Sequence, residues 1–308
     1  MKEIIIGTRG SKLALYQAKE TKRLLENQFP EHRFVIEIIH TKGDKILDVA
    51  LSKIGGKGLF TKEIEQALTD KKIDLAVHSM KDLPTEYPKG LHLSAVLKRG
   101  EARDALVSIG KRKLSELTDK DIIATSSVRR TAELLNYNPN FQIVDIRGNV
   151  DTRLKKWQSG YCTAMVMAGA GLQRLKLDDA ISELLDTKQM IPAPAQGIIA
   201  IESRNDDNFI NGLLAEINHK ETWIRANAEY TFLKTLGGGC QVPIGCYTSL
   251  SKDTFEITSI VLSPNGKKSL KETRKGNIID AEMTAKKMAE DFIEKGALQI
   301  IGNLENPL

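Results

Sequence analysis

The sequence predicts an α/β protein of two or three domains, and three observations support this fold class. Short apolar runs alternate with amphipathic stretches, which is the pattern of strand–helix units around a mostly parallel sheet. A chain of 308 residues is longer than one ordinary hydrophobic core supports. Two stretches interrupt the pattern: "KRGEARD" at Lys98–Asp104 is polar, and "IPAPAQG" at Ile191–Gly197 contains two prolines. We expect the chain to cross between domains there.

The first region begins with a strand at Ile4–Ile6. Ser11 then opens a helix, because a serine side chain caps free backbone N–H groups and Ala14, Ala18 and Leu25 share one helical face. The other elements expected in this region are a strand at Phe34–Ile39, a helix marked by Phe60, Ile64, Ala67 and Leu68, and strands at Ile73–His78 and Leu91–Leu97.

Two further regions follow along the chain. The second has strands expected at Ile122–Ala124, Ile143–Ile146 and Ala164–Met167, each followed by a helical pattern, and Ile198–Glu202 resumes as a strand after the prolines. The third starts near Lys220 with the helix "TWIRANAEYTFLKTL". Its other elements are a glycine turn, alternating strands across Phe255–Leu262 and a closing helix near Ala281–Lys295.

Composition excludes several classes of protein. Hydrophobic residues make up 41% and charged residues 28% of the chain, as in globular proteins, and no apolar run approaches the length of a membrane span. The net charge of +5 is mild, and 5% aromatic residues are too few for a base-stacking platform. Three cysteines do not form a disulfide framework, and "MKEIIIGTRGSK" lacks a signal-peptide core. We therefore expect a cytoplasmic protein without nucleic-acid or membrane partners.

Basic and hydroxyl side chains gather after the predicted strands. In open α/β sheets, ligands bind beyond the carboxyl ends of the strands. The residues at these positions are Thr8, Arg9, Gly10 and Ser11, the stretch His78–Asp82, Thr125, Ser126, Ser127, Arg129 and Arg130, Arg147 and Arg153, and Gly169, Gly171 and Arg174. A single arginine is usually a solvated surface residue. Six near strand ends favour a polyanion site, since the guanidinium fork suits carboxylates and phosphates.

Asp82 stands among these cations in the loop "MKDLP". On position alone, two roles are about equally supported. It pairs with Lys81 or Arg9, or it is a negative charge reserved for a cationic reaction centre within an anionic substrate.

The stretch "LGGGCQVPIG" places Cys240 directly after three glycines. Glycines remove side-chain bulk, so a ligand can approach the sulfur closely, although most lone cysteines are small buried hydrophobes. The five histidines show no metal-ligand spacing, so no metal is expected. "GGKG" at Gly55–Gly58 lacks the Ser or Thr of a phosphate-binding P-loop and is interpreted as a mobile lid.

Nine stretches together resemble one enzyme family, porphobilinogen deaminase, also called hydroxymethylbilane synthase. They are "GTRGSKLAL", "TKGD", "GGKGLFTKEIE", "AVHSMKDLP", "TSSVRR", "RGNVDTRL", "AGLQRL", "PAQG" and "GGGCQVPIG". They occur in the family's order and spacing and span nearly the whole chain. Each is weak alone, and the combination is highly specific.

The resemblance implies a transferase of tetrapyrrole (haem) biosynthesis. Cys240 would carry one dipyrromethane cofactor through a thioether bond, as a primer. Four porphobilinogen molecules would be deaminated and joined to it in turn, and hydrolysis would release hydroxymethylbilane. Loss of ammonia leaves a cationic azafulvene, which Asp82 is placed to stabilise. The implied partners are porphobilinogen and a downstream tetrapyrrole enzyme that takes the product, and the implied assembly is a monomer.

The resemblance also distributes roles over the strand-end residues. Asp82 is the implied catalytic residue. The implied cofactor-binding residues are Lys81, Thr125, Ser126, Ser127, Arg129, Arg130, Arg147 and Gly148, with Cys240 attached covalently. The implied substrate-binding residues are Arg9, Ser11, Arg147, Arg153, Ala168, Arg174 and Gln196. Lys57 and Phe60 are the implied lid.

The family's fold has two domains like a type II periplasmic binding protein and a smaller α/β domain with the cysteine. Domain 1 would comprise residues 1–97 and 198–217, domain 2 residues 103–191, and domain 3 residues 220–308. Thr163, where an acidic residue is frequent, and Pro194–Ala195, in place of a common Val–Gly, depart from the family pattern.

Two other classes of function compete with the enzyme. The fold is shared with solute-binding proteins, so a receptor for a polycarboxylate is the main alternative, and a nucleic-acid-binding module is a distant third. Only the deaminase requires a covalent dipyrrole, which the intact mass of the purified protein would reveal.

Overall fold

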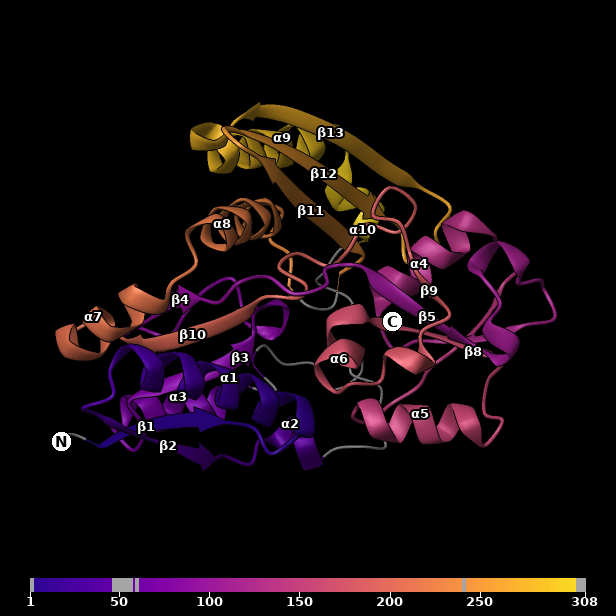
Figure 1. Ribbon diagram of the computed structural model, residues 1–308. Helices are drawn as coiled ribbons and strands as arrows, with labels where there is room; N and C mark the ends of the chain where they lie inside the picture. Colours follow the sequence, from indigo (N-terminus) through magenta and orange to yellow (C-terminus); the bar gives the residue numbers. More distant parts are fainter. Residues whose placement is uncertain (1–2, 46–57, 59–60, 240–241, 303–308) are drawn as a thin grey trace. The chain divides into compact units, whose positions relative to one another are not determined.

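The computed structural model describes residues 3–45, 58, 61–239 and 242–302 (Figure 1). The chain divides into two compact units. Unit 1 comprises residues 1–48, 56–100 and 198–223, and unit 2 comprises residues 49–55, 101–197 and 224–308. Within the described ranges, no helix is both long and apolar enough to cross a membrane.

Unit 1 is built on a five-stranded sheet with the order β2-β1-β3-β10-β4. Its strands are β1 (Glu3–Thr8), β2 (Arg33–Ile38), β3 (Leu75–Ser79), β4 (Leu91–Val96) and β10 (Ile199–Arg204). Strand β1 pairs in parallel with β2 and β3, whereas β10 runs antiparallel between β3 and β4. The antiparallel strand is the one that the chain adds last, after it has passed through residues 101–197 of unit 2.

Helices cover both faces of this sheet because β3 alternates its side chains. Leu75 and Val77 pack in one core with α1 (Lys12–Gln28) and α7 (Asn208–Ile217), and Ala76 packs in another with α3 (Lys62–Thr69). Short helices α2 (Lys42–Lys45) and η2 (Met80–Asp82) follow β2 and β3. The carboxyl ends of β1 and β3 therefore open at one edge of a sheet that is buried on both faces.

The first sheet of unit 2 repeats this topology. Its order is β7-β6-β8-β5-β9, with antiparallel β5 in the place that β10 takes in unit 1. The strands are β5 (Asp104–Ser108), β6 (Ile122–Ala124), β7 (Gln142–Val144), β8 (Ala164–Ala168) and β9 (Glu183–Leu184). The helices are α4 (Val128–Tyr137), α5 (Val150–Gln158) and α6 (Gly169–Arg174).

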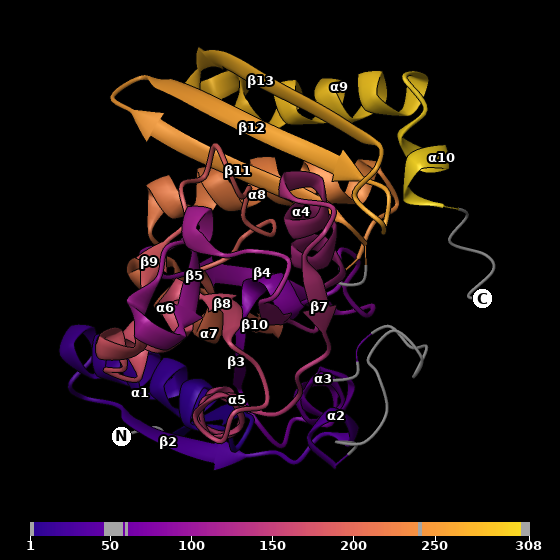
Figure 2. The ribbon, with the colours of Figure 1, turned by 90° about the vertical axis from the view of Figure 1, so that its right-hand side faces the viewer.

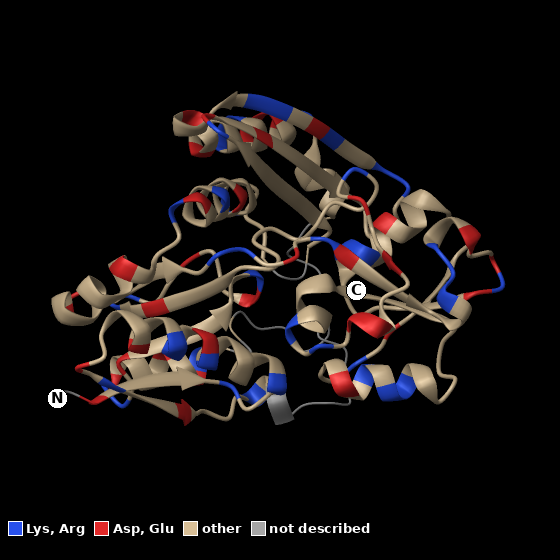
Figure 3. Ribbon diagram, in the orientation of Figure 1, with Lys and Arg blue, Asp and Glu red and all other residues tan. Residues whose placement is uncertain are grey.

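A second, antiparallel sheet in unit 2 follows α8 (Lys220–Thr235), and Figure 2 shows α9 lying along it. Its strands are β11 (Ile244–Ser251), β12 (Thr254–Leu262) and β13 (Ser269–Asn277), followed by α9 (Ala281–Glu294) and α10 (Ala297–Ile301). One core joins α8, α9, α10 and this sheet. The edge strand β13 carries charges of both signs (Figure 3), a feature that discourages pairing with another chain. The remaining 3₁₀ helices are η3 (Ile109–Lys111), η4 (Leu114–Glu116), η5 (Asp178–Ala180) and η6 (Ile278–Asp280).

The predicted α/β fold class is confirmed, as are most of the predicted strands and helices. Ser11 caps α1 as expected, since its Oγ accepts a hydrogen bond from the N–H of Ala14 at 3.2 Å. The sequence analysis missed β5, which continues directly from the "KRGEARD" stretch, the two-residue β9, the helix α7, and the strands β11 and β13 on either side of the predicted Phe255–Leu262 strand. The proposed boundaries of three domains stay a prediction. Phe60 lies outside the described residues.

The core under the antiparallel sheet generates a test of stability. The rings of Phe232 and Phe292 are fully buried and meet edge to face, with centroids 5.5 Å apart. Phe232→Ala should lower the free energy of unfolding by about 3–5 kcal/mol, because it leaves a cavity lined by α9. Met283→Ala is the control, since that side chain is 67% exposed. Equal urea midpoints for the two variants would contradict this account of the core.

Candidate functional site

In unit 1, the predicted site residues follow two neighbouring parallel strands. Arg9 and Ser11 come after β1, and Lys81 and Asp82 lie in η2 after β3. Because β1 and β3 are paired in parallel, these residues lie at the same edge of the sheet. The buried amide of Gln17 ties α1 to this edge by donating to Ser79 Oγ at 2.7 Å.

The turn that carries Asp82 is held by bonds to the sheet beneath it. The N–H of Met80 donates to the carbonyl of Ile198 at 3.0 Å, and the N–H of Leu83 closes the turn on Met80 at 2.9 Å. Asp82 itself is half-buried. The backbone therefore presents its carboxylate from a fixed position at the end of a buried strand.

A buried contact between a histidine and a glutamate lies on β3 and β10 close to this turn. His78 Nε2 and Glu202 Oε2 are 2.9 Å apart, and both side chains are almost fully buried. On the same face, burial raises the pKa of Glu65 on α3, although a hydrogen bond from Thr61 opposes the shift. Sequence analysis placed His78 at the strand end but missed its partner, because Glu202 is remote in the chain.

In unit 2, the predicted residues likewise follow three adjacent parallel strands. Thr125 to Ser127 come after β6, Arg147 and Gly148 after β7, and Ala168 ends β8. Ser127 caps α4, as its Oγ accepts from the N–H of Arg130 at 3.4 Å, and the Oγ1 of Thr125 accepts from the N–H of Ser127 at 3.3 Å. The half-buried Ser126 lies between them.

The side chain of Arg147 is mostly buried, and two of its nitrogens lack hydrogen-bond acceptors among the described residues. Its side chain is 12% exposed, and its Nε lies 3.8 Å from Asp145 Oδ2, beyond hydrogen-bond distance. Within the described part of the chain, its buried Nε and Nη2 have no hydrogen-bond acceptor. A buried cationic donor without an acceptor is costly, so this guanidinium is set up to receive an anion.

The turn after Arg147 requires glycine. Gly148 has φ +112°, and a Cβ there would come within 2.7 Å of Thr152. Arg153 stabilises the same turn by donating from Nε to the carbonyl of Gly148 at 2.7 Å. Arg147 and Gly148 thus lie in one bend between β7 and α5, and Arg153 of α5 stabilises it.

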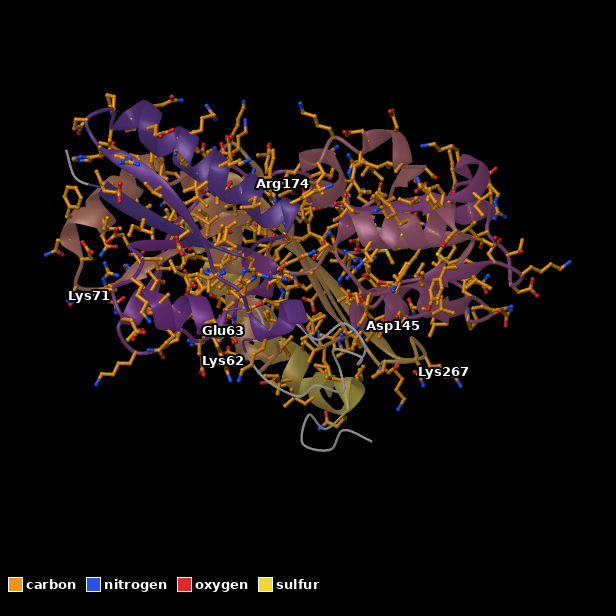
Figure 4. All side chains as sticks on the ribbon, turned by 90° about the horizontal axis from the view of Figure 1, so that it is seen from below. Lys62, Glu63, Lys71, Asp145, Arg174 and Lys267 are labelled. Carbon is orange, nitrogen blue, oxygen red and sulfur yellow. The ribbon has the colours of Figure 1, made fainter. Side chains whose placement is uncertain are left out.

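Figure 4 shows Asp145 and Arg174 on two separate segments of the unit.

Arg129, Arg130 and Gln196 meet in a buried network around a carboxylate that sequence analysis did not select, Asp104. Asp104 Oδ2 lies 2.8 Å from Arg129 Nη2, and Oδ1 lies 2.8 Å from Arg130 Nη2. Gln196 Nε2 donates to Asp104 Oδ1 at 2.9 Å, and its Oε1 accepts from Arg130 at 3.2 Å. Burial alone would raise the pKa of Asp104, but the two guanidinium groups outweigh it and hold that pKa well below its usual value.

A second missed carboxylate, Glu133, completes the network. Its Oε2 accepts from Arg129 Nη1 at 2.7 Å, and its Oε1 accepts from the N–H of Ile191 at 2.8 Å. Burial raises the pKa of Glu133 to about 7, while the Arg129 guanidinium opposes this shift and the Asp104 carboxylate adds to it. No local signal identifies Asp104 or Glu133, because burial depends on how β5 and α4 pack.

The Ile191–Gly197 segment is fastened to the rest of unit 2 at several points. Arg174 Nη2 donates to the carbonyl of Gly197 at 2.7 Å, and the N–H of Ala195 donates to Glu229 Oε2 at 2.6 Å. Ala195 has φ +58°, in the left-handed region that favours glycine. Thr163, the other departure from the family pattern, donates a hydrogen bond from Oγ1 to Asp121 Oδ1 at 3.0 Å. Cys240, Lys57 and Phe60 lie outside the described residues.

Two family profiles cover most of the chain. The profile described as "Porphobilinogen deaminase, dipyromethane cofactor binding domain" matches residues 4–212, and "Porphobilinogen deaminase, C-terminal domain" matches residues 223–294. The chain belongs to the porphobilinogen deaminase family. This membership disfavours the receptor alternative.

Relatives of nearly equal length bear out this assignment. The porphobilinogen deaminase of Syntrophomonas wolfei subsp. wolfei is 44% identical over 301 residues, covering 98% of each chain. That of Bacillus velezensis is 45% identical over 310 residues, covering 100% of this chain and 98% of the relative. Among solved structures, the periplasmic aliphatic sulphonate binding protein SsuA from Escherichia coli covers 99% of this chain and 94% of its own, with 15% identity and a TM-score of 0.43.

The residues of unit 2 fit the dipyrromethane that this family binds, since each of its pyrrole rings carries carboxylates. The Nε and Nη2 of Arg147 offer donors without hydrogen-bond acceptors among the described residues, and the next residue, Gly148, has no room for a side chain. Backbone N–H groups at the start of α4, after Ser127, add further donors.

The Asp104 network yields a test that is independent of activity. Asp104→Asn should destabilise the protein by about 3–5 kcal/mol, because two buried guanidinium groups lose their shared counter-ion. Asp291→Asn is the matched control, since it also removes a carboxylate bound to an arginine, Arg274, but at a more exposed pair. Urea unfolding measures both. If Asp104→Asn costs no more than the control, the network does not hold unit 2 together.

Proposed function

We infer that this chain is a transferase that joins four porphobilinogen molecules head to tail and releases hydroxymethylbilane and ammonia, a step of tetrapyrrole biosynthesis. Membership of the porphobilinogen deaminase family supports this activity. The structural observation that carries it is the buried side chain of Arg147 beside a glycine turn, whose Nε and Nη2 have no hydrogen-bond acceptor among the described residues. Such a group calls for an anionic ligand, and the pyrrole units of this reaction carry carboxylates.

The arginines and hydroxyls of unit 2 bind and orient the carboxylates of the cofactor and the growing chain. Arg147 supplies unused donors, Arg153 holds the bend that positions it, and the cap of α4 adds backbone N–H groups. When bound, the dipyrromethane supplies the pyrrole carbon to which the first porphobilinogen is joined. We assign its attachment to Cys240, since a thiolate is a strong nucleophile and the three preceding residues are glycines, which carry no side-chain bulk.

Asp82 is assigned to the reaction itself. Loss of ammonia from porphobilinogen develops positive charge on the pyrrole, and a carboxylate fixed at a strand end stabilises that charge. The same carboxylate can hold a proton leaving the pyrrole nitrogen. Arg9, Ser11 and Lys81 follow neighbouring strands in the same unit and would bind substrate carboxylates. A monomer in the cytoplasm that passes its product to a downstream enzyme stays a prediction.

Intact mass tests the attachment point. Wild-type protein should carry one dipyrrole, and Cys240→Ser should carry none, because a hydroxyl is a far weaker nucleophile near neutral pH. Cys162→Ala and Cys246→Ala are the controls and should keep the adduct, since both side chains are buried. A dipyrrole mass that persists after loss of Cys240 would exclude this residue.

Turnover tests the role of Asp82. Asp82→Asn keeps the shape of the side chain but not its charge, so kcat should fall by about 10²-fold or more while the cofactor stays attached. Glu86→Gln is the control, because it removes an exposed carboxylate four residues along the same loop. Turnover close to wild type in an Asp82→Asn protein of verified mass would overturn the assignment.

A further inference from the structure

Glu133 and Arg129 together bind both backbone polar groups of Ile191, the first residue of the Ile191–Gly197 segment. Arg129 Nη1 donates both to Glu133 Oε2 at 2.7 Å and to the carbonyl of Ile191 at 2.8 Å. Glu133 Oε1 accepts from the N–H of Ile191 at 2.8 Å. The three groups form a closed ring of hydrogen bonds, so the carboxylate of Glu133 fixes both the guanidinium of Arg129 and the backbone at Ile191.

The charge of this cluster depends on Glu133. Arg129 and Arg130 face the carboxylates of Asp104 and Glu133, so the cluster is neutral when both carboxylates are ionised. All four side chains are at least nine-tenths buried, so little solvent screens them. The pKa of Asp104 is held low by both arginines. Glu133 is therefore the member of the cluster whose protonation can leave a net positive charge.

The groups around Glu133 set the pH at which its carboxylate takes up a proton. Arg129 of α4 faces it directly, Arg130 and Asp104 act on it electrostatically, and the N–H of Ile191 donates to it. Strand β12, which packs on α4, contributes apolar Ile260 and Leu262. Burial dominates and raises the pKa of Glu133 to about 7. The carboxylate is thus ionised above that pH and neutral below it.

Arg129 also has a hydrogen-bond donor that this ring of hydrogen bonds does not use. Its Nε is buried and has no hydrogen-bond acceptor within the described part of the chain. While the cluster is neutral, a further buried anion beside it would add an unbalanced charge. When Glu133 is neutral, the same anion would balance the excess positive charge of the arginine pair.

We propose that Glu133 is a positioning residue that controls whether Arg129 and Arg130 can bind a carboxylate of a pyrrole ligand. When ionised, Glu133 neutralises Arg129 and holds it against Ile191. Only when Glu133 takes up a proton can the arginine pair bind the carboxylate. The proton comes from solvent, and no covalent bond changes. The proposal rests on the proposed function, in which Arg129 and Arg130 bind the carboxylates of the primer during its attachment.

The test compares the rates at which apo-protein gains its dipyrrole from porphobilinogen, followed by intact mass, in wild type and Glu133→Gln. The ratio of the two rates cancels the pH dependence of the Cys240 thiol, which both chains share. We expect the ratio to be near one at pH 6 and about tenfold in favour of the variant at pH 8, since the neutral fraction of a group with a pKa of about 7 falls by that factor. Asp291→Asn is the control and should match wild type at both pH values.

Each possible result either supports or overturns the proposal. A ratio that does not change with pH, or a variant that gains its dipyrrole more slowly than wild type throughout, would overturn the proposal. Glu133→Met, which removes the charge at similar length, should give the same ratio and serves if the Gln variant does not fold. If wild type gains no dipyrrole at any pH, the proposed function fails instead, and the two failures are distinguishable.

Discussion

The carboxylate of Asp104 between two buried guanidinium groups is the interaction on which unit 2 depends. Arg129 and Arg130 are adjacent in sequence, and their charges would repel if no counter-ion lay between them. Asp104 supplies that counter-ion from the first residue of β5, at 2.8 Å from each arginine. The same carboxylate accepts from Gln196 at 2.9 Å. One side chain thereby links a strand, a helix and the Ile191–Gly197 segment.

That segment lacks the regular hydrogen bonds of a helix or strand, and side chains replace them. Both backbone polar groups of Ile191 are bonded to side chains of α4. The N–H of Ala195 is bonded to Glu229, and the carbonyl of Gly197 to Arg174. Proline nitrogens cannot donate, so fewer backbone donors need partners in this stretch. The arginines that sequence analysis assigned to ligands therefore also organise the backbone.

Unit 1 has the same sheet topology as the first sheet of unit 2. Asp82 follows β3 in this unit, and the β10 segment supports the turn that carries it. Ile198, just before β10, accepts from the N–H of Met80, and Glu202 on β10 contacts His78. In each sheet the chain inserts the antiparallel strand after crossing from the other unit. The residues that support the candidate site are thus remote in sequence from the strand-end residues themselves.

The sequence by itself determined the fold class, most strands and helices of the two parallel sheets, and the strand-end residues. Periodicity depends on which faces are apolar, and capping and turn residues such as Ser11 and Gly148 act within a few positions, so both are visible locally. The family motifs added the enzyme class. Only the tertiary structure decided which charged side chains are buried and which groups they interact with. Asp104 and Glu133 resemble any surface carboxylate until β5 and α4 pack, because the burial that raises the pKa of Glu133 is created by segments far away in the chain.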